Sequence, residues 1–504
     1  MSKISFNINK TGEKFKQYWK KEITAGRASE GLREDWRNQL KEVQREIGFE
    51  YIRFHGIFHD DMMIYKENDE GVPYYNWQYF DNLLDFLLSI GLHPILELGF
   101  MPSALSSGAD TVFWWKGNST PPKDYQKWFE LIKETVRHSI NRYGINEVLK
   151  WYFEVWNEPN LGSFWSSTQD EYFKLYNYSA KAIKSVDRRL KVGGPSTSGA
   201  DFRECKGRVP YVEAFLEYCN TNQLPVDFVS AHPYPTYWPL DTEGVKLMGY
   251  MDEFATVNHL KAIRGSVMNS SYKNAEIHLT EWNSSPSPRD LVHDTAFMAP
   301  YIIDNNIKGI GLVDSLGFWT FTDIFEENGA GDTLFHGGFG LINLQGLKKA
   351  SYYGYWFLSR LGSEKIACGD NYFVTKKDGK IVVLLWNYCH YKEHFANGDR
   401  SELNLLERYD IFEEKEISIN LKIEGLDGNY KILKYVFGRN NGSAYDVWVN
   451  NSAPNYPTQE DLNIISKKVG PEGSIDYIKN VNVFNQEFIL KSHDVVLIEL
   501  TKQL

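Results

Sequence analysis

The sequence has few cysteines and lacks a long apolar run. Its four cysteines lie far apart in a chain of 504 residues and form no C-x-x-C pair, which argues against a disulfide framework or a zinc knuckle. No apolar run of about 18 residues is present to cross a membrane, and the first residues, MSKISFNINK, do not follow the basic-then-apolar order of a signal peptide. We therefore expect a soluble cytoplasmic protein without a membrane partner.

Motifs for nucleic-acid, metal and cofactor binding are also missing. The formal net charge is −11, and the lysines and arginines are scattered rather than gathered along one stripe, so we expect no nucleic-acid partner. The 12 histidines include no H-E-x-x-H, and neither G-x-G-x-x-G after the first strand nor a G-x-S-x-G elbow occurs. We accordingly expect no metal, no dinucleotide cofactor and no serine esterase chemistry.

Aromatic residues, in contrast, are plentiful. They make up 15% of a chain that is 42% hydrophobic, and the length is enough for a large domain and at least one smaller one. Sugar rings stack their C–H faces on aromatic side chains, so the excess favours a carbohydrate ligand, although core packing also uses aromatic residues.

From about residue 46 to 345, short apolar runs alternate with longer amphipathic segments. This alternation is typical of repeated β/α units and favours a closed (β/α)₈ TIM barrel, whose chemistry lies at the C-terminal ends of the strands. Helices are predicted over Tyr79–Ile90, Tyr125–Tyr143 and Glu171–Val186, and a further strand is expected near Asp110–Trp115 or at the next helix boundary. The predicted strands are Tyr51–His55, Pro94–Leu98, Tyr152–Trp156, Lys191–Gly193, Phe228–His232, Ile277–Glu281 and Leu316–Phe321.

Beyond about residue 346 the pattern changes to short alternating runs that are typical of antiparallel strands. The N-terminal Ile4–Ile8 alternates in the same way and is expected to join them. We therefore expect a catalytic barrel over residues 10–345 and an accessory all-β sandwich from residues 1–9 and 346–504. The runs are Lys380–Trp386, Glu416–Leu421, Tyr430–Tyr435, Phe488–Leu490 and Asp494–Leu500.

Two glutamates follow predicted strands directly. Glu158 stands in WYFEVWNEPN, where Pro159 ends strand pairing and leaves Glu158 at the C-terminal edge. Strand parity places Glu154 on the same face, and a buried Glu154 is costly unless a bulge resets the register, so the register stays open. Glu281 follows a β run in IHLTEWNSS. In a closed barrel the two carboxyl groups can face each other, as cleavage of a glycosidic bond requires.

Seven segments in order resemble the β-xylosidases of glycoside hydrolase family 39, within the clan of retaining (β/α)₈ glycosidases. The resemblance implies a retaining, exo-acting β-D-xylosidase that releases xylose from xylo-oligosaccharides or aryl xylosides by double displacement, and it also suggests a homo-oligomer. The segments are R-x-H-G at Arg53–Gly56, G-F-M-P at Gly99–Pro102, T-V-F-W-W at Thr111–Trp115, F-E-V-W-N-E-P-N-L at Phe153–Leu161, V-D-F-V-S at Val226–Ser230, W-T-F-T-D-I-F-E-E at Trp319–Glu327 and F-H-G-G-F-G-L at Phe335–Leu341.

The resemblance implies a role for each matching residue. Glu158 is expected to be the acid/base, Glu281 the nucleophile, and Asn157 the partner of the sugar 2-hydroxyl. The remaining residues are expected to surround the terminal sugar. They are His55, His232 and Tyr234 as lining, Trp319 as the floor, Glu327 as an acceptor for sugar hydroxyls, and Trp114 as a limit on space near C5.

The sequence departs from the family pattern at Ala231, Pro233 and Trp282, which leaves the exact sugar open. The alternatives are a β-glucosidase, an arabinose-releasing enzyme, an α-L-iduronidase or an inactive sugar-binding barrel. An iduronidase must bind a carboxylate, and the matched loops hold no basic cluster beyond Arg53. The presence of both glutamates argues against an inactive barrel.

Overall fold

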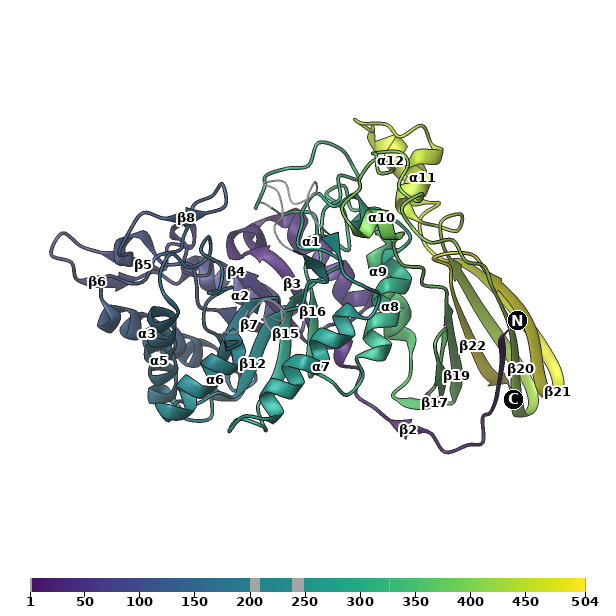
Figure 1. The fold of residues 1–504 in the computed structure, drawn as a ribbon, viewed down its shortest axis with the longest axis horizontal. Coiled ribbons are helices and arrows are strands. Elements are labelled where there is room, and N and C mark those ends of the chain that lie inside the picture. Colours follow the sequence, from purple (N-terminus) through teal and green to yellow (C-terminus); the bar gives the residue numbers. More distant parts are fainter. Residues whose placement is uncertain (1, 200–208, 238–248, 326, 504) are drawn as a thin grey trace.

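The computed structural model describes residues 2–199, 209–237, 249–325 and 327–503. It consists of a closed barrel and a separate region made mostly of sheet (Figure 1). The barrel strands are all parallel to their neighbours, and the circle closes from β16 back to β3. In chain order they are β3 (Glu22–Arg27), β4 (Tyr51–His55), β7 (His93–Glu97), β10 (Tyr152–Glu154), β11 (Lys191–Ser198), β12 (Phe228–His232), β15 (Glu276–Trp282) and β16 (Ser315–Phe318).

The predicted barrel is confirmed, and the seven predicted strands correspond to β4, β7, β10, β11, β12, β15 and β16. The prediction of a further strand near Asp110–Trp115 was wrong for the barrel, because β8 (Thr111–Val112) pairs only with β9 (Gly117–Asn118) in a short hairpin. The missing strand is β3, which precedes the others. Its sequence EITAGR contains a glycine and two charged residues, so it lacks the apolar run on which strand prediction depends.

Helices surround the barrel, and polar caps fix where two of the longest begin. Asp124 accepts hydrogen bonds from the first backbone N–H groups of α3, and Thr168 does the same for α5. The two helices pack together through Trp128, whose indole N–H donates to Ser179 at 2.9 Å. None of the described helices is both long and apolar enough to cross a membrane. The helices are α1 (Glu34–Glu46), α2 (Gln78–Ser89), α3 (Tyr125–Tyr143), α4 (Ile145–Val148), α5 (Gln169–Val186), α6 (Tyr211–Thr221), α7 (Ala255–Met268) and α8 (Met298–Lys308).

The second region is an eight-stranded sheet in the order β1-β20-β22-β19-β18-β17-β2, with β21 also paired to β20. As expected, the N-terminal strand joins it, because β1 runs parallel to the first part of β20. The short β2 also belongs to this sheet through its pairing with β17. The N-terminal segment that joins the sheet therefore extends past residue 9, the predicted boundary. The strands are β1 (Ser2–Asn7), β2 (Glu13–Lys14), β17 (Glu364–Gly369), β18 (Tyr372–Lys377), β19 (Lys380–Trp386), β20 (Ile417–Phe437), β21 (Glu472–Leu490) and β22 (Val495–Gln503).

This region is not all sheet. Its part of the chain also carries α10 (Glu393–Ala396), α11 (Ala444–Asn450) and α12 (Gln459–Ser466). The helix after β16, α9 (Ala350–Arg360), instead packs on α8, and its Tyr355 contacts Phe318 of β16, so the barrel continues past the predicted boundary at residue 345. Buried polar contacts hold the second region on the barrel. The fully buried Arg408 donates to Asp294 at 2.9 Å and to the carbonyl oxygen of Phe335, while the indole N–H of Trp386 donates to Asp304 on α8.

Candidate active site

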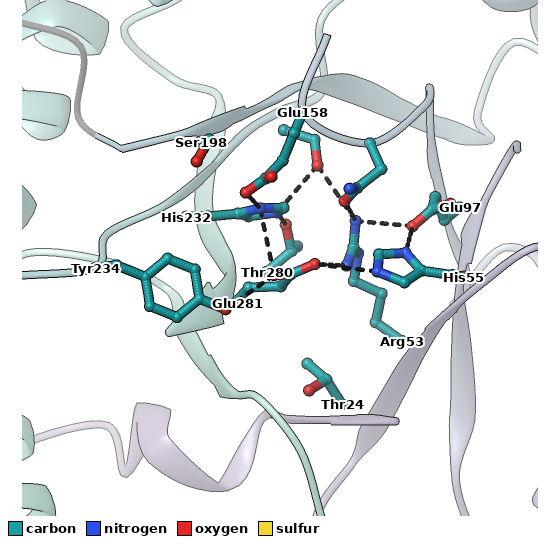
Figure 2. Close-up of polar contacts among 12 residues, drawn as sticks. Thr24, Arg53, His55, Glu97, Glu158, Ser198, His232, Tyr234, Thr280 and Glu281 are labelled. Carbon is teal, nitrogen blue, oxygen red and sulfur yellow. Dashed lines mark hydrogen bonds and ion pairs between the residues drawn. The ribbon is translucent and has the colours of Figure 1, made fainter. Parts of the chain in front are cut away.

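Glu158 and Glu281 meet at the C-terminal end of the barrel. One carboxylate oxygen of each, together with a ring nitrogen of His232, lie within 4.8 Å of one another. Both glutamates are buried, and Figure 2 shows them on either side of the His232 ring. The two strand-end glutamates singled out in the sequence therefore share one site.

The backbone after β10 explains why Glu154 and Glu158 both reach the barrel interior. Trp156 has φ 71° and Glu158 has φ 44°, a left-handed conformation that interrupts the alternation of an extended strand. The Glu158 N–H donates to the carbonyl oxygen of Ser196 at 2.8 Å, which fixes this turn against β11. The open question of register is settled: β10 ends at Glu154, and strand parity does not extend to Glu158.

Arg53 organises the floor of the site. Its guanidinium is fully buried and donates to Glu154 at 2.6 Å, to Glu281 at 2.7 Å and to Asn157 at 2.8 Å. The nitrogen that donates to Asn157, Nη2, also lies 3.0 Å from Oε2 of Glu97. One planar cation thus holds three buried carboxyl groups in fixed directions. Figure 2 shows two of them, Glu97 and Glu281, beside Arg53.

The two histidines of the site carry different charges. Burial, together with the nearby charges of Arg53 and His55, lowers the pKa of His232 well below its ordinary value, so its ring is neutral. Nδ1 of His232 lies 2.8 Å from Oε1 of Glu158. Burial also opposes the charged form of His55, but the carboxylates of Glu97, Glu327 and Glu281 outweigh it and raise the pKa of His55 to about 10.

The pKa values of the two glutamates are both raised, but by different balances of burial and charge. Burial and the charge of Glu281 raise the pKa of Glu158 well above its ordinary value. Burial also raises the pKa of Glu281, to about 7, while Arg53 and then His55 favour its ionised form. At pH 7 the site therefore holds a protonated Glu158, while Glu281, next to its two cations, is about half ionised and becomes fully ionised as the pH rises.

Most of the other predicted site residues lie around this pair. The Tyr234 hydroxyl donates to Oε2 of Glu281 at 2.9 Å, and the buried Trp319 ring lies 4.7 Å from the His55 ring. Glu327 Oε1 is 3.5 Å from His55 Nε2. Trp114 lies farther out, with 58% of its surface exposed. Its neighbour Phe113 stacks on His55 instead, at 6.2 Å between ring centres.

The departures at Ala231 and Trp282 do not reach the site. Ala231 is fully buried in the hydrophobic core around the barrel. Trp282 packs against Tyr301 of α8, and its indole N–H donates to Tyr355 at 3.2 Å. Pro233 is the one departure that lies between two site residues, His232 and Tyr234.

Sequence reasoning did not predict several residues that shape the site. Glu97, Ser196 and Thr280 were absent from the expected set, and Phe113 was noted only within a matching segment. Thr280 donates to Glu154 at 2.7 Å, and the Ser196 hydroxyl lies 3.0 Å from His232 Nε2. The one signal for Glu97 is its position at the end of a buried strand, the same signal that identified Glu158 and Glu281.

The donor atoms of Glu158, His232 and Glu281 lie close enough together to hold a metal ion. In the described parts of the chain, Glu158, His232 and Glu281 are the only carboxylates and histidines that converge closely enough to share an ion. Arg53 and the charged His55 lie beside Glu281, and their positive charges oppose a cation there. The donor set suits proton transfer better than metal binding.

A closed parallel barrel with two converging glutamates at its C-terminal end defines a glycoside hydrolase. Residues 2–476 match the family described as glycosyl hydrolases family 39. The chain belongs to that family and is a glycosidase.

Two relatives named β-xylosidases are similar to this chain over most of their length. A β-xylosidase of Geobacillus stearothermophilus is 37% identical, covering 98% of this chain and 95% of that protein. A β-xylosidase of Caldicellulosiruptor saccharolyticus is 45% identical, covering 72% of each. Among solved structures, a monomeric β-xylosidase of Caulobacter crescentus CB15 superposes with a TM-score of 0.90 and 32% identity over 100% of both chains.

Proposed function

We propose that the protein is a retaining, exo-acting β-D-xylosidase that removes xylose from xylo-oligosaccharides or aryl xylosides. The observation that carries this proposal is the separation of the two glutamates, whose nearest carboxylate oxygens are no more than 4.8 Å apart. That spacing suits direct attack on the sugar, which needs carboxyl groups about 5–5.5 Å apart, whereas inversion needs about 6.5–9.5 Å to admit a water. The xylosidase names of two relatives support the choice of sugar.

In the first step Glu281 attacks the anomeric carbon and Glu158 protonates the leaving oxygen. Arg53 and His55 favour the ionised form of Glu281, which is the form that attacks, while burial and the charge of Glu281 keep Glu158 protonated. The products are a glycosyl ester on Glu281, with inverted configuration, and the released alcohol.

In the second step a water molecule attacks the ester and Glu158 removes its proton. The charge of Glu281 is the second cause that raises the pKa of Glu158. Because the ester carries no charge, this cause disappears once the intermediate forms, and the pKa of Glu158 falls. Glu158 thereby changes from acid to base, and the second displacement restores the β configuration.

The surrounding residues then bind the terminal sugar. We assign the sugar 2-hydroxyl to Asn157. Arg53 donates to Oδ1 of Asn157 at 2.8 Å, and this contact leaves the amide N–H₂ group of Asn157 as the donor to the sugar. His55 and Glu327 form a charged pair for other ring hydroxyls, and Trp319 forms the floor. His232 and Tyr234 complete the lining through their contacts with Glu158 and Glu281.

The test removes each glutamate separately. Glu281→Ala should be inactive on every xyloside, because no covalent intermediate can form. Glu158→Ala should still react with a xyloside of an acidic phenol and release a burst of phenol followed by slow turnover. On a substrate with a poor leaving group it should lose about 10²–10⁴-fold in rate. Glu130→Ala, at an exposed position on α3, is the control.

Azide distinguishes the two roles. In Glu158→Ala it should attack the trapped intermediate and give a β-xylosyl azide. In Glu281→Ala it should enter from the vacated face and give the α-azide. If the two variants exchange these products, the role assignment is reversed, and if neither loses activity the proposed site is wrong.

We also propose that the enzyme works in the cytoplasm on small carbohydrates and forms a homo-oligomer, as its resemblance to family 39 suggested. Cell fractionation and light scattering of the purified chain test these two points.

A further inference from the structure

A second cavity opens beside the active site. It has a volume of about 520 Å³, within the range of about 300–1,000 Å³ that is common for small-molecule sites. Its walls come from distant parts of the chain: the loop after β7, the loops after β16, and the segment between α11 and α12. The residues with side chains suited to a ligand are Trp114, Phe325, Asp332, Gln345, Asn455 and Tyr456.

Two aromatic side chains in this cavity face solvent. Tyr456 is 91% exposed and Trp114 is 58% exposed, whereas most of the chain's large aromatic residues are buried. An exposed aromatic ring costs hydrophobic free energy unless a partner covers it. The lining of the same cavity also includes Asp332, Gln345 and Asn455, whose side chains can form hydrogen bonds. Flat apolar faces next to hydrogen-bonding groups match the two surfaces of a sugar ring.

The cavity is next to the active site but separate from it. Phe325 lines the cavity, and its ring also packs against Trp319 and Phe339, with ring centres 5.9 Å and 5.2 Å apart. Trp319 in turn contacts His55. Phe325 therefore stands between the cavity and the residues around the two glutamates, and neither glutamate lines the cavity.

We propose that this cavity is a second carbohydrate-binding site, in which the ring of Tyr456 from the sheet-rich region stacks on a short stretch of a xylo-oligosaccharide, while Trp114 lies at the border with the catalytic pocket. The choice of sugar rests on the proposed function, and the position of the site rests on the cavity itself. The site holds a sugar chain independently of the xylose being cleaved, which keeps the substrate close to the catalytic pocket.

The experiment measures binding while the catalytic pocket is filled. The enzyme is first labelled covalently with a 2-deoxy-2-fluoro-xyloside of an acidic phenol, and mass spectrometry verifies the label. Calorimetric titration with xylotetraose should still detect binding. Tyr456→Ala should weaken that binding about tenfold, as expected for the loss of a stacking partner. Tyr456→Phe should retain it, since the ring face is kept.

Tyr477→Ala is the matched control, because Tyr477 is an exposed tyrosine of the sheet-rich region that lies outside the cavity. It should bind xylotetraose as the unaltered chain does. Absence of binding to the labelled enzyme, or equal binding by Tyr456→Ala, overturns the proposal. If the fluorosugar does not label the enzyme, double displacement is contradicted instead. Titrations of the inactive Glu281→Ala variant, with and without Tyr456→Ala and with excess xylose in the catalytic pocket, then decide the cavity.

Discussion

Arg53 should set the pH at which the enzyme becomes active. Its guanidinium donates to Glu281 at 2.7 Å and is a main cause that favours the ionised form of that carboxyl, whose pKa is about 7. An opposite charge at such a distance lowers a carboxyl pKa by about one to three pH units. In Arg53→Met the acid limb of kcat/KM should therefore move to higher pH by that amount, and kcat/KM at pH 7 should fall about 5- to 500-fold.

The assay is a pH profile of kcat/KM with an aryl xyloside, corrected for the fraction of enzyme that a fluorosugar can label. This correction is needed because removing one partner of a buried ion network costs about 3–5 kcal/mol of stability. Arg53→Lys keeps a positive charge but loses the planar guanidinium. The acid limb of its kcat/KM profile should therefore lie between those of the unaltered enzyme and Arg53→Met. Arg142→Met, which removes an exposed arginine paired with Asp85, is the control. A lower rate with the acid limb unmoved would show that Arg53 only positions Glu281 and would refute the electrostatic reasoning.

Two further predictions concern specificity and stability. Trp114→Ala should reduce the ratio of kcat/KM for xylosides to that for glucosides, because it opens space near C5. If only Phe113→Ala reduces this ratio, the preference is set by Phe113, which stacks on His55. Burial lowers the pKa of His493 to about 3, and neither of its ring nitrogens has a hydrogen-bond partner in the described structure. The unfolded chain takes up a proton below about pH 6.5 while the folded one does not, so the folded state should lose about 2 kcal/mol by pH 5. Thermal unfolding of His493→Phe between pH 7.5 and 5 should depend less on pH, and an unchanged pH dependence would contradict this explanation.

Much of the fold could be predicted because buried parallel strands have apolar sequences. Tyr51–His55 and Phe228–His232 were predicted with their observed ends, since each is buried throughout. The long β20 was predicted as two strands, Glu416–Leu421 and Tyr430–Tyr435. Gly425 and Gly428 lie between them with positive φ, and the register of pairing with β21 shifts there. Local sequence identifies such a break but does not tell whether the chain continues on the other side in the same strand.

The convergence of Glu158 and Glu281 could be predicted, but the network of contacts beneath them could not. Glu158 and Glu281 each follow an apolar run, which is a local signal. Glu154 looked too costly to bury because its partners, Arg53 and Thr280, lie 101 and 126 residues away in sequence. The free energy of a buried carboxyl group depends on such partners, and only closure of the barrel brings them together.

The charges around the two glutamates also support our proposal that Glu158 is the acid. Glu281 lies 2.7 Å from Arg53 and 3.6 Å from His55, both of which are cations. Glu158 instead contacts the neutral ring of His232 and lies close to the charge of Glu281. Removing the proton from Glu158 would place a second negative charge beside the first without a new cation, whereas protonating Glu281 would leave Arg53 and His55 less compensated. If Glu281 carried the proton and Glu158 the charge, the negative charge would move away from Arg53 and His55 to a site next to a neutral ring. The proton is therefore more stable on Glu158 in the free enzyme.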